Sequence, residues 1–382
     1  MTSISLLIIP NRRYNMNMGR KKIFAILMAT IGCLIFNFNL KLAGEPYFCH
    51  IASDEVVSQP NNLLTNALSS RMTRVKGCPA DLFVYAGYGH MREYNVLVES
   101  SYKNNTYALV LGVDNVWTFA NEKYFRLGTA LGRVHGKTIP CDTPSGKENA
   151  FKDIYQMLDI DFNHDTYGVE LFGAYESFND KCLKTNIGVI LGYNYGKDKT
   201  HVKDKHGMGE INIKFASHNI LLGVEFIKNL YAYEGYQFGL WLKADYDHVI
   251  LRMDEVNYDH VALRMDEDEE LEKDEHKFDH KYRHHSLATV VGLNVEKEIF
   301  EHADRKLTLS LKTGWEFRIK YAIVTFDTED PGESMYFKNA AVVSLKASQK
   351  LNDHWSIDGS CSARFNKDFS AHGFAGGIEY AF

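Results

Sequence analysis

Apolar and polar residues alternate with a period of two over long stretches of this chain, and this pattern constrains the fold more than any other feature. The clearest case is the segment 307–318. One set of alternate residues there consists of Leu307, Leu309, Leu311, Thr313, Trp315 and Phe317. The intervening set consists of Thr308, Ser310, Lys312, Gly314, Glu316 and Arg318. Successive side chains of a β-strand point to opposite faces, so the pattern predicts a strand with one apolar and one polar face.

Twelve segments with this alternation follow one another up to the C-terminus. Their ranges are 82–89, 106–113, 124–132, 166–175, 186–195, 217–226, 236–246, 286–296, 307–318, 340–348, 355–366 and 370–382. An even number of antiparallel strands closes into a barrel without an unpaired edge, as a lipid environment requires. We therefore predict an all-β fold, a 12-stranded antiparallel transmembrane β-barrel over residues 82–382. Aromatic residues make up 13% of the chain and proline only 7 residues, which suits long strands with aromatic girdles.

The connections between these segments alternate in length. The long set comprises 90–105, 133–165, 196–216, 247–285 and 319–339, with 367–369 as its one short member. The other set, none longer than ten residues, comprises 114–123, 176–185, 227–235, 297–306 and 349–354. Bacterial outer-membrane barrels have short periplasmic turns and longer extracellular loops. We therefore predict a bacterial outer-membrane location with the long loops facing the cell exterior.

The last predicted strand ends the chain on an aromatic residue. Its apolar face contains Phe374, Ile378, Tyr380 and Phe382. Such an ending resembles the signal by which the assembly machinery of Gram-negative outer membranes recognises its substrates. The resemblance implies that this machinery, periplasmic chaperones and outer-membrane lipid are the partners of the chain.

The N-terminal region predicts export across the inner membrane. Arg20, Lys21 and Lys22 precede the apolar run 23–36, which is short for a membrane span and has the form of a signal-peptide core. We predict a signal peptide over residues 1–43, with Met16 and Met18 as alternative start residues. An uncleaved anchor helix is the competing interpretation.

Residues 44–81 form a linker that is too short for a domain, and we expect one amphipathic helix at 62–75 within it. Its apolar stripe contains Leu64, Leu68 and Met72 at helical spacing, and its basic side contains Arg71 and Arg74.

A helix with Leu and Arg before a twelve-stranded barrel that ends in an aromatic residue resembles the translocator domain of autotransporters. Local sequences similar to that family are F-V-Y-A-G-Y-G-H at 83–90, T-Y-G-V-E-L-F-G-A-Y at 166–175, G-V-I-L-G-Y-N-Y-G at 188–196 and G-L-W-L-K-A-D-Y at 239–246. The resemblance implies protein secretion or surface display, with the helix inside the pore. This chain has only about forty residues where the family carries a large passenger. Passenger activities therefore do not carry over.

A barrel of twelve strands leaves a bore about as wide as a helix. The residues predicted to face this lumen are Arg126, Glu170, Glu225, Lys243, Lys312, Glu316, Arg318 and Arg364. Acidic members, namely Glu170, Glu225 and Glu316, are candidate partners of Arg71 in the inserted helix. The alternative is that the lumen residues solvate the wall or pair with one another.

Two other functions compete with a translocator. An open, porin-like diffusion channel requires the helix to lie in the periplasm. A barrel enzyme is disfavoured, because Asn163-His164-Asp165 and Asp247-His248 supply only isolated pieces of known catalytic sets. We therefore predict no catalytic residues and no cofactor. The net charge of −6 gives no indication of nucleic-acid binding. We expect a monomer.

The predicted loop 247–285 contains a tandem repeat, with Tyr246–Glu255 recurring at Tyr258–Glu267, followed by more acidic residues and histidines. A solvated acidic loop is favoured over a divalent-cation site, because no ligand set of fixed spacing closes a site. No metal site is predicted. Cys49 and Cys78 are candidates for a disulfide in the oxidising periplasm.

Overall fold

The computed structural model describes residues 64–69, 71–73, 80–95, 100–120, 122–140, 158–179, 182–204, 210–259, 281–302, 305–325, 332–367 and 369–382. The predicted signal peptide, Arg74, the Cys49 and Cys78 pair and the segment 260–280 of the acidic loop lie outside these residues.

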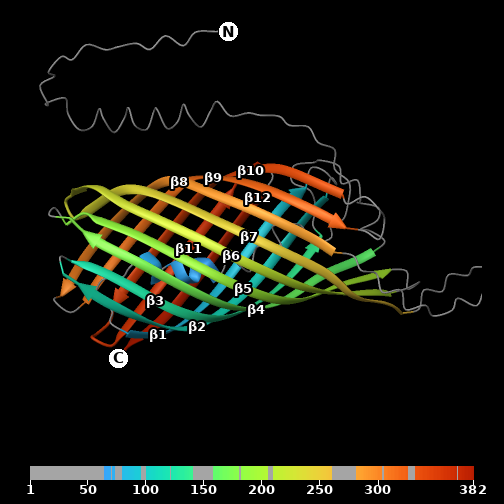
Figure 1. Ribbon diagram of the computed structural model, residues 1–382, viewed down its shortest axis with the longest axis horizontal. Helices are drawn as coiled ribbons and strands as arrows, with labels where there is room; N and C mark the ends of the chain where they lie inside the picture. The colour runs from blue at the N-terminus through green and yellow to red at the C-terminus, as the bar shows by residue number, and fades with distance from the viewer. Residues whose placement is uncertain are drawn as a thin grey trace, which may run out of the picture. The chain divides into compact units, whose positions relative to one another are not determined.

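Twelve β-strands make up nearly all of the described chain (Figure 1). They are β1 Ala80–Asn95, β2 Ser100–Phe119, β3 Lys123–Pro140, β4 Leu158–Phe178, β5 Lys184–Asp204, β6 Glu210–Tyr233, β7 Tyr236–Asp259, β8 Lys281–His302, β9 Arg305–Thr325, β10 Gly332–Lys350, β11 Trp355–Phe365 and β12 Phe369–Ala381. Each strand pairs antiparallel with its neighbours in sequence, and β1 pairs with β12 to close the barrel. The predicted 12-stranded antiparallel barrel is thus confirmed.

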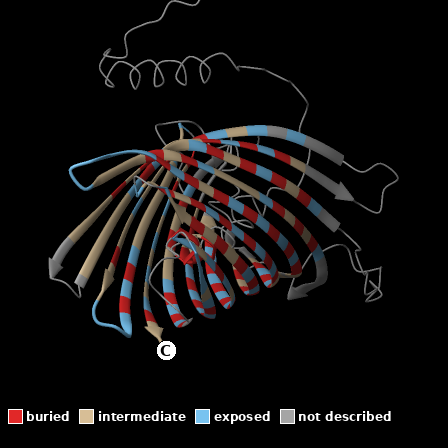
Figure 2. Ribbon diagram, turned by 60° about the vertical axis from the view of Figure 1, so that its left-hand side comes forward, coloured by how far each residue is buried: buried red, intermediate tan, exposed pale blue. Residues whose placement is uncertain are grey.

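Buried and exposed residues alternate along many of the strands (Figure 2), and the two faces of the sheet are opposite in character to those of a soluble protein. Large apolar side chains point outward, with Leu109 56%, Leu131 60% and Leu171 53% exposed. Charged side chains point inward, and Lys312 and Arg318 are only 7% and 3% exposed. A continuous apolar exterior of this kind is suited to lipid and not to water.

Strands β1 to β10 are longer than the sequence pattern predicts. β6 and β7 have 24 residues each, whereas the alternating segments cover only 217–226 and 236–246. Most of the extra length lies at the end of the barrel where the long connections are predicted; β7 runs through the first copy of the tandem repeat to Asp259. Backbone pairing requires no apolar face, so strands continue after the alternation of hydropathy has stopped. The sequence pattern therefore overestimates the lengths of the long loops.

At the opposite end the strands are joined by short turns that asparagine side chains shape. The Asn179 carboxamide oxygen accepts the Leu183 backbone N–H at 2.9 Å between β4 and β5. The Asn352 carboxamide oxygen accepts the backbone N–H groups of His354 and Trp355 at 2.9 and 2.8 Å between β10 and β11. The bond from His354 to Asn352 is that of an Asx turn, and the bond from Leu183 to Asn179 ties the two sides of the other turn together. We call this the short-turn end of the barrel, and the other the long-loop end.

An arginine on the outward face should be costly only within the apolar band. We expect Leu171→Arg to destabilise the barrel by about 2–4 kcal/mol, because the guanidinium would lie in hydrocarbon. On the same strand, the outward Asn163 lies among polar residues at the long-loop end, so Asn163→Arg should cost little. Denaturant unfolding in phospholipid vesicles measures both, and equal costs would contradict a lipid-facing band.

Candidate functional site: the inner helix and its attachment

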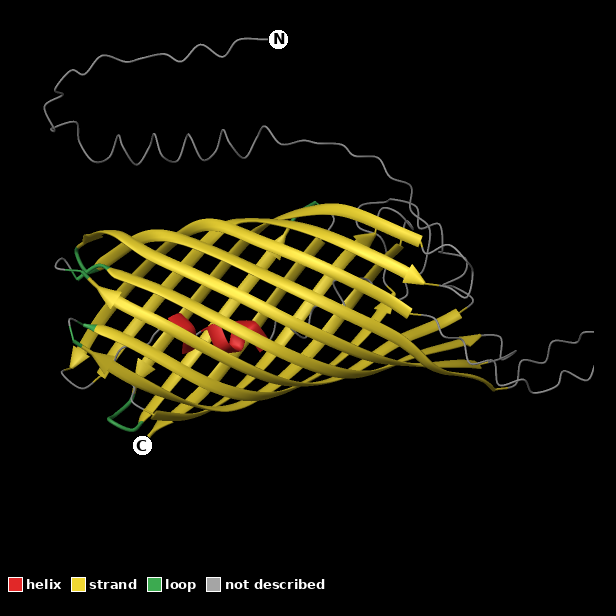
Figure 3. Ribbon diagram, in the orientation of Figure 1, coloured by secondary structure: helices red, strands yellow, loops and turns green. Residues whose placement is uncertain are grey.

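A short helix lies inside the barrel, drawn in red in Figure 3. We call residues 64–69 and 71–73, which are helical, the inner helix. Its apolar stripe of Leu64, Leu68 and Met72 is at most 2% exposed. These residues are four apart, so their side chains lie above one another on one helix face.

The apolar stripe packs against one side of the barrel wall. It belongs to a hydrophobic cluster that includes Phe83 of β1, Phe172 of β4 and Ile190 of β5. Two glycines make room for it. A Cβ atom at Gly132 would lie 2.4 Å from Leu64 Cδ2, and one at Gly188 would lie 2.8 Å from Met72 Cβ. The helix can approach the wall closely only because these two positions lack a side chain.

The other side of the inner helix carries polar groups that reach the remaining strands. Ser69 Oγ donates to Glu225 Oε2 of β6 at 2.9 Å, and Asn66 Nδ2 donates to Ser362 Oγ of β11 at 3.3 Å. Asn186 of β5 donates to the Met72 carbonyl at 2.9 Å.

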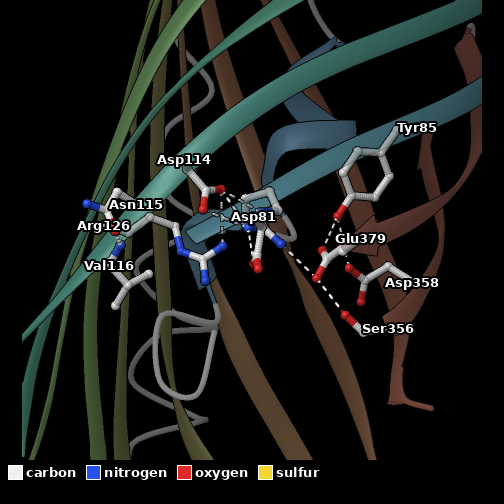
Figure 4. A network of polar contacts seen from close by, with 10 residues as sticks. Asp81, Tyr85, Asp114, Asn115, Val116, Arg126, Ser356, Asp358 and Glu379 are labelled. Carbon is white, nitrogen blue, oxygen red and sulfur yellow. Dashed lines mark hydrogen bonds and ion pairs between the residues drawn. The ribbon is translucent and has the colours of Figure 1, made fainter. Parts of the chain in front are cut away.

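Arg71 makes the strongest attachment, to three carboxylates that lie close together in Figure 4. Its Nη2 is 2.5 Å from Asp81 Oδ2, its Nη1 is 2.6 Å from Glu379 Oε2, and its Nε donates to Asp114 Oδ2 at 2.8 Å. The side chain is 2% exposed, and its guanidinium also lies over the Phe83 ring at 5.1 Å. A planar guanidinium has five donors, so it can bind several carboxylates at once.

Two of these carboxylates come from the strands that close the barrel, β1 and β12, and the third comes from the neighbouring strand β2. Asp81 lies on β1, Asp114 on β2 and Glu379 on β12. Asp81 and Asp114 are direct cross-strand partners, an arrangement that is destabilising for like charges unless a cation lies between them. Arg71 supplies that cation from the helix. The same positive charge therefore holds the helix in the pore and stabilises the closed barrel.

The surrounding residues complete a buried polar network (Figure 4). Glu379 accepts from the Tyr85 hydroxyl at 2.5 Å and from Ser356 Oγ at 2.9 Å. The Tyr85 hydroxyl is also 2.9 Å from Asp358 Oδ2. Arg126 provides a second cation, 3.3 Å from Asp114. Asp81, Asp114 and Glu379 therefore share two arginines, and the loss of Arg71 would leave these three buried carboxylates with Arg126 alone.

All eight residues predicted to face the lumen lie on the inward face of the sheet, but none of the acidic ones pairs with Arg71. Glu225 instead pairs with Lys312 at 2.5 Å and accepts Trp241 Nε1 at 2.9 Å. Glu316 pairs with Arg318 at 3.2 Å and with Arg364 at 2.7 Å. The carboxylate of Glu170 is buried, and among the described residues neither of its oxygens has a hydrogen-bond partner. Lys243 pairs with Asp245 at 2.6 Å.

The expected partners of Arg71 were wrong because the helical pattern does not determine how the helix is rotated inside the pore. Seating the apolar stripe on β3 and β5 turns Arg71 toward β1, β2 and β12. Alternation counted from Ile378 and Tyr380 of the predicted apolar face puts Glu379 on the opposite face of the terminal strand, but the sequence pattern singled out neither Asp81 nor Asp114. Both are inward carboxylates near a strand end. Only the pairing of the strands shows that they lie side by side and need a shared cation.

The apolar residues of the terminal strand lie on the outside. Phe374 and Ile378 are each 54% exposed, and Phe382 is 74% exposed. Tyr380 packs between Trp355 and Phe382, with ring centroids 4.9 and 5.3 Å away. Trp355, Tyr380 and Phe382 form an aromatic group on the lipid-facing surface at the short-turn end.

The inner helix leaves space beside it at the short-turn end. A cavity of about 260 Å³ there is lined by Thr73 of the helix and by residues of several strands, including Lys184, Glu296 and Lys346.

Among the described residues, no group of three or more His, Cys, Asp or Glu side chains is arranged to hold a metal ion. No helix in the described part of the chain is long and apolar enough to cross a membrane.

The barrel with its inner helix is similar to solved autotransporter structures. The beta domain of the Bordetella autotransporter Brka is 11% identical, with 80% of this chain and 100% of that chain covered and a TM-score of 0.53. The translocator domain of NalP from Neisseria meningitidis is 12% identical, with 86% and 96% covered and a TM-score of 0.54. The transport unit of AIDA-I from Escherichia coli is 13% identical, with 85% and 98% covered and a TM-score of 0.52.

At these identities the likeness establishes the fold, which is that of autotransporter translocator domains. The sequence itself matches no protein-family model and no curated protein.

Arg71→Ala should weaken the attachment of the inner helix, because it removes one cation from among buried carboxylates. We expect a loss of about 3 kcal/mol, typical of breaking a buried ion pair by removing one partner. Asp114→Asn added to Arg71→Ala should restore part of that loss, because fewer carboxylates are then left unpaired. In a background without other cysteines, Ser69→Cys reports helix release through its labelling by a bulky, impermeant thiol reagent. Equal labelling with and without Arg71 would contradict this role.

Proposed function

We propose that this chain is a bacterial outer-membrane barrel of the translocator or surface-display type, with the inner helix occupying its pore. Its partners are outer-membrane lipid, periplasmic chaperones and the outer-membrane assembly machinery, with the terminal strand as the assembly signal. Residues 1–43 act as the signal peptide, residues 82–382 form the membrane domain, and the barrel works as a monomer. The long-loop end faces the cell exterior.

The direction of the inner helix is the observation that carries this proposal. Leu64 meets Gly132, nine residues after the start of β3 at the short-turn end, whereas Met72 meets Gly188, four residues after the start of β5. The C-terminal part of the helix is therefore nearer the short-turn end, and the chain leads from there into β1. Leu64, the first described residue of the helix, accordingly lies nearer the long-loop end than Met72 does. A translocated segment followed by its own barrel has this direction.

The contacts of the inner helix also support a plug. Its apolar stripe, Arg71 and Ser69 each have a matching surface on the wall, so the helix is held from more than one side. A helix in the periplasm would leave Asp81, Asp114 and Glu379 without this cation. The interior of the barrel is thus complementary to the helix in shape and in charge.

Conductance in planar bilayers distinguishes this function from a diffusion channel. We expect the full-length barrel to pass little current, because the helix fills most of the bore, and deletion of residues 44–79 to increase the conductance several-fold. The deletion ends before β1, so the wall is retained. Heat-modifiable mobility in gels serves as the control for folding. High conductance that the deletion leaves unchanged would favour the porin-like channel.

The assembly signal is tested at the last residue. Phe382→Asp places a charge on the lipid-facing end of β12 and removes the terminal aromatic group. We expect secretion into the periplasm to continue while assembly in the outer membrane fails, as measured by cell fractionation and heat-modifiable mobility. Phe382→Tyr, which keeps an aromatic ring, is the matched control. Normal assembly of the Asp variant would contradict the proposed signal.

A further inference from the structure

The outer surface of β3 to β6 changes abruptly from apolar to basic toward the long-loop end. The last wholly apolar or aromatic row across these strands joins Leu131, Val169, Tyr193 and Ile220 in register. These side chains are 45–60% exposed. Because the barrel exterior is the lipid-facing surface in the proposed function, this row marks the upper part of the hydrocarbon layer.

The next row is amphipathic and joins Arg133, Tyr167, Tyr195 and His218. The Arg133 guanidinium lies over the Tyr167 ring at 5.5 Å. His218 Nδ1 is 2.8 Å from the Tyr193 hydroxyl of the row below. Tyrosine and arginine in this arrangement have an apolar part and a polar tip, which is typical of a membrane–water interface.

Two charged rows follow, each about 7 Å further along the strands. The first joins His135, Asp165 and Lys197, and the second joins Lys137, Asn163 and Lys199. All of these residues share the outward face with the apolar row, so they lie on the polar side of the interface that the Arg133 row marks.

The cations of these rows outnumber the carboxylates near them. We call Arg133, Lys137, Lys197 and Lys199 the basic patch. Arg133 and His135 share Asp165, at 3.3 and 3.1 Å, and Lys137 pairs with Asp161 at 2.6 Å. The ion pairs of the described residues include neither Lys197 nor Lys199, and both side chains are exposed. The four lysine and arginine side chains against two carboxylates leave a net charge of +2.

We propose that the basic patch binds a lipid whose head group carries a phosphate monoester, with the acyl chains lying along the apolar row below. This inference rests on the proposed membrane location of the barrel. A phosphate monoester carries a charge of about −1.5 to −2 at neutral pH, close to the excess charge of the patch. Arginine binds phosphate oxygens as a fork and lysine as a point charge.

The position of the patch favours a lipid over a soluble anion. Its cations begin with Arg133, one row above the side chains that contact hydrocarbon, so one lipid molecule can contact both surfaces. Free phosphate would gain the charge interaction only. The aromatic row between the two surfaces lies where the head group joins the chains.

Native mass spectrometry of the full-length barrel in a neutral detergent tests this proposal. Phosphatidic acid, phosphatidylglycerol and phosphatidylcholine with identical chains provide a monoester, a diester and a zwitterionic head group. We expect the strongest binding for phosphatidic acid and the weakest for phosphatidylcholine. Lys197→Gln with Lys199→Gln should weaken the binding of phosphatidic acid about thirtyfold, the scale expected for two lysines at a lipid surface. Asp165→Asn should strengthen it.

Lys123 and Lys228 supply the matched control, because they are exposed cations on β3 and β6 at the short-turn end. Lys123→Gln with Lys228→Gln changes the net charge equally and should leave the binding of phosphatidic acid unchanged. An equal loss in this control, or equal affinity for all three lipids, would overturn the proposal. Displacement of phosphatidic acid by millimolar inorganic phosphate would also overturn it, since the patch would then be a site for the free anion.

Insertion of the same protein into bilayers is recorded in parallel. A chain that inserts but shows no lipid preference disproves only the basic patch. A chain that does not insert disproves the proposed membrane function itself.

Discussion

Closure of the sheet by β1 and β12 is the constraint on which the rest of the structure depends. In lipid, an unpaired strand edge leaves backbone N–H and C=O groups without partners, so the first and last strands must meet. Around this seam the chain has gathered Asp81, Asp114 and Glu379, whose mutual repulsion opposes closure. Arg71 relieves that repulsion from inside the pore. The helix is therefore part of the electrostatics of the wall.

The reversed distribution of apolar residues explains the character of the interior. With most large apolar side chains on the outside, the lumen is lined with charges, and these pair with one another across the strands. The main hydrophobic cluster inside forms where the inner helix brings Leu64, Leu68 and Met72 against Phe83 and Phe172. The helix thus provides both the apolar contacts and the cation that this half of the lumen needs.

The two ends of the barrel differ for physical reasons that bear on function. At the short-turn end, asparagine-shaped turns and aromatic side chains end the strands close to the apolar band. At the long-loop end the strands continue beyond it, and their outward face becomes basic within two rows. The inner helix points its N-terminal side toward that end. The strand ends, the inner helix and the outer surface therefore share one polarity.

The sequence by itself determined the number of strands, the face of each side chain and the apolar stripe of the helix. These features depend only on local periodicity, which a pattern of two or of three to four residues records directly. The tertiary structure alone decided which carboxylates bind Arg71, how far the strands extend and which outward cations share a row. Those features depend on helix rotation and on the register between strands, and neither leaves a mark on the residues of a single segment. The terminal Glu379 illustrates both, because its face was readable from alternation whereas its partner was set by closure of the barrel.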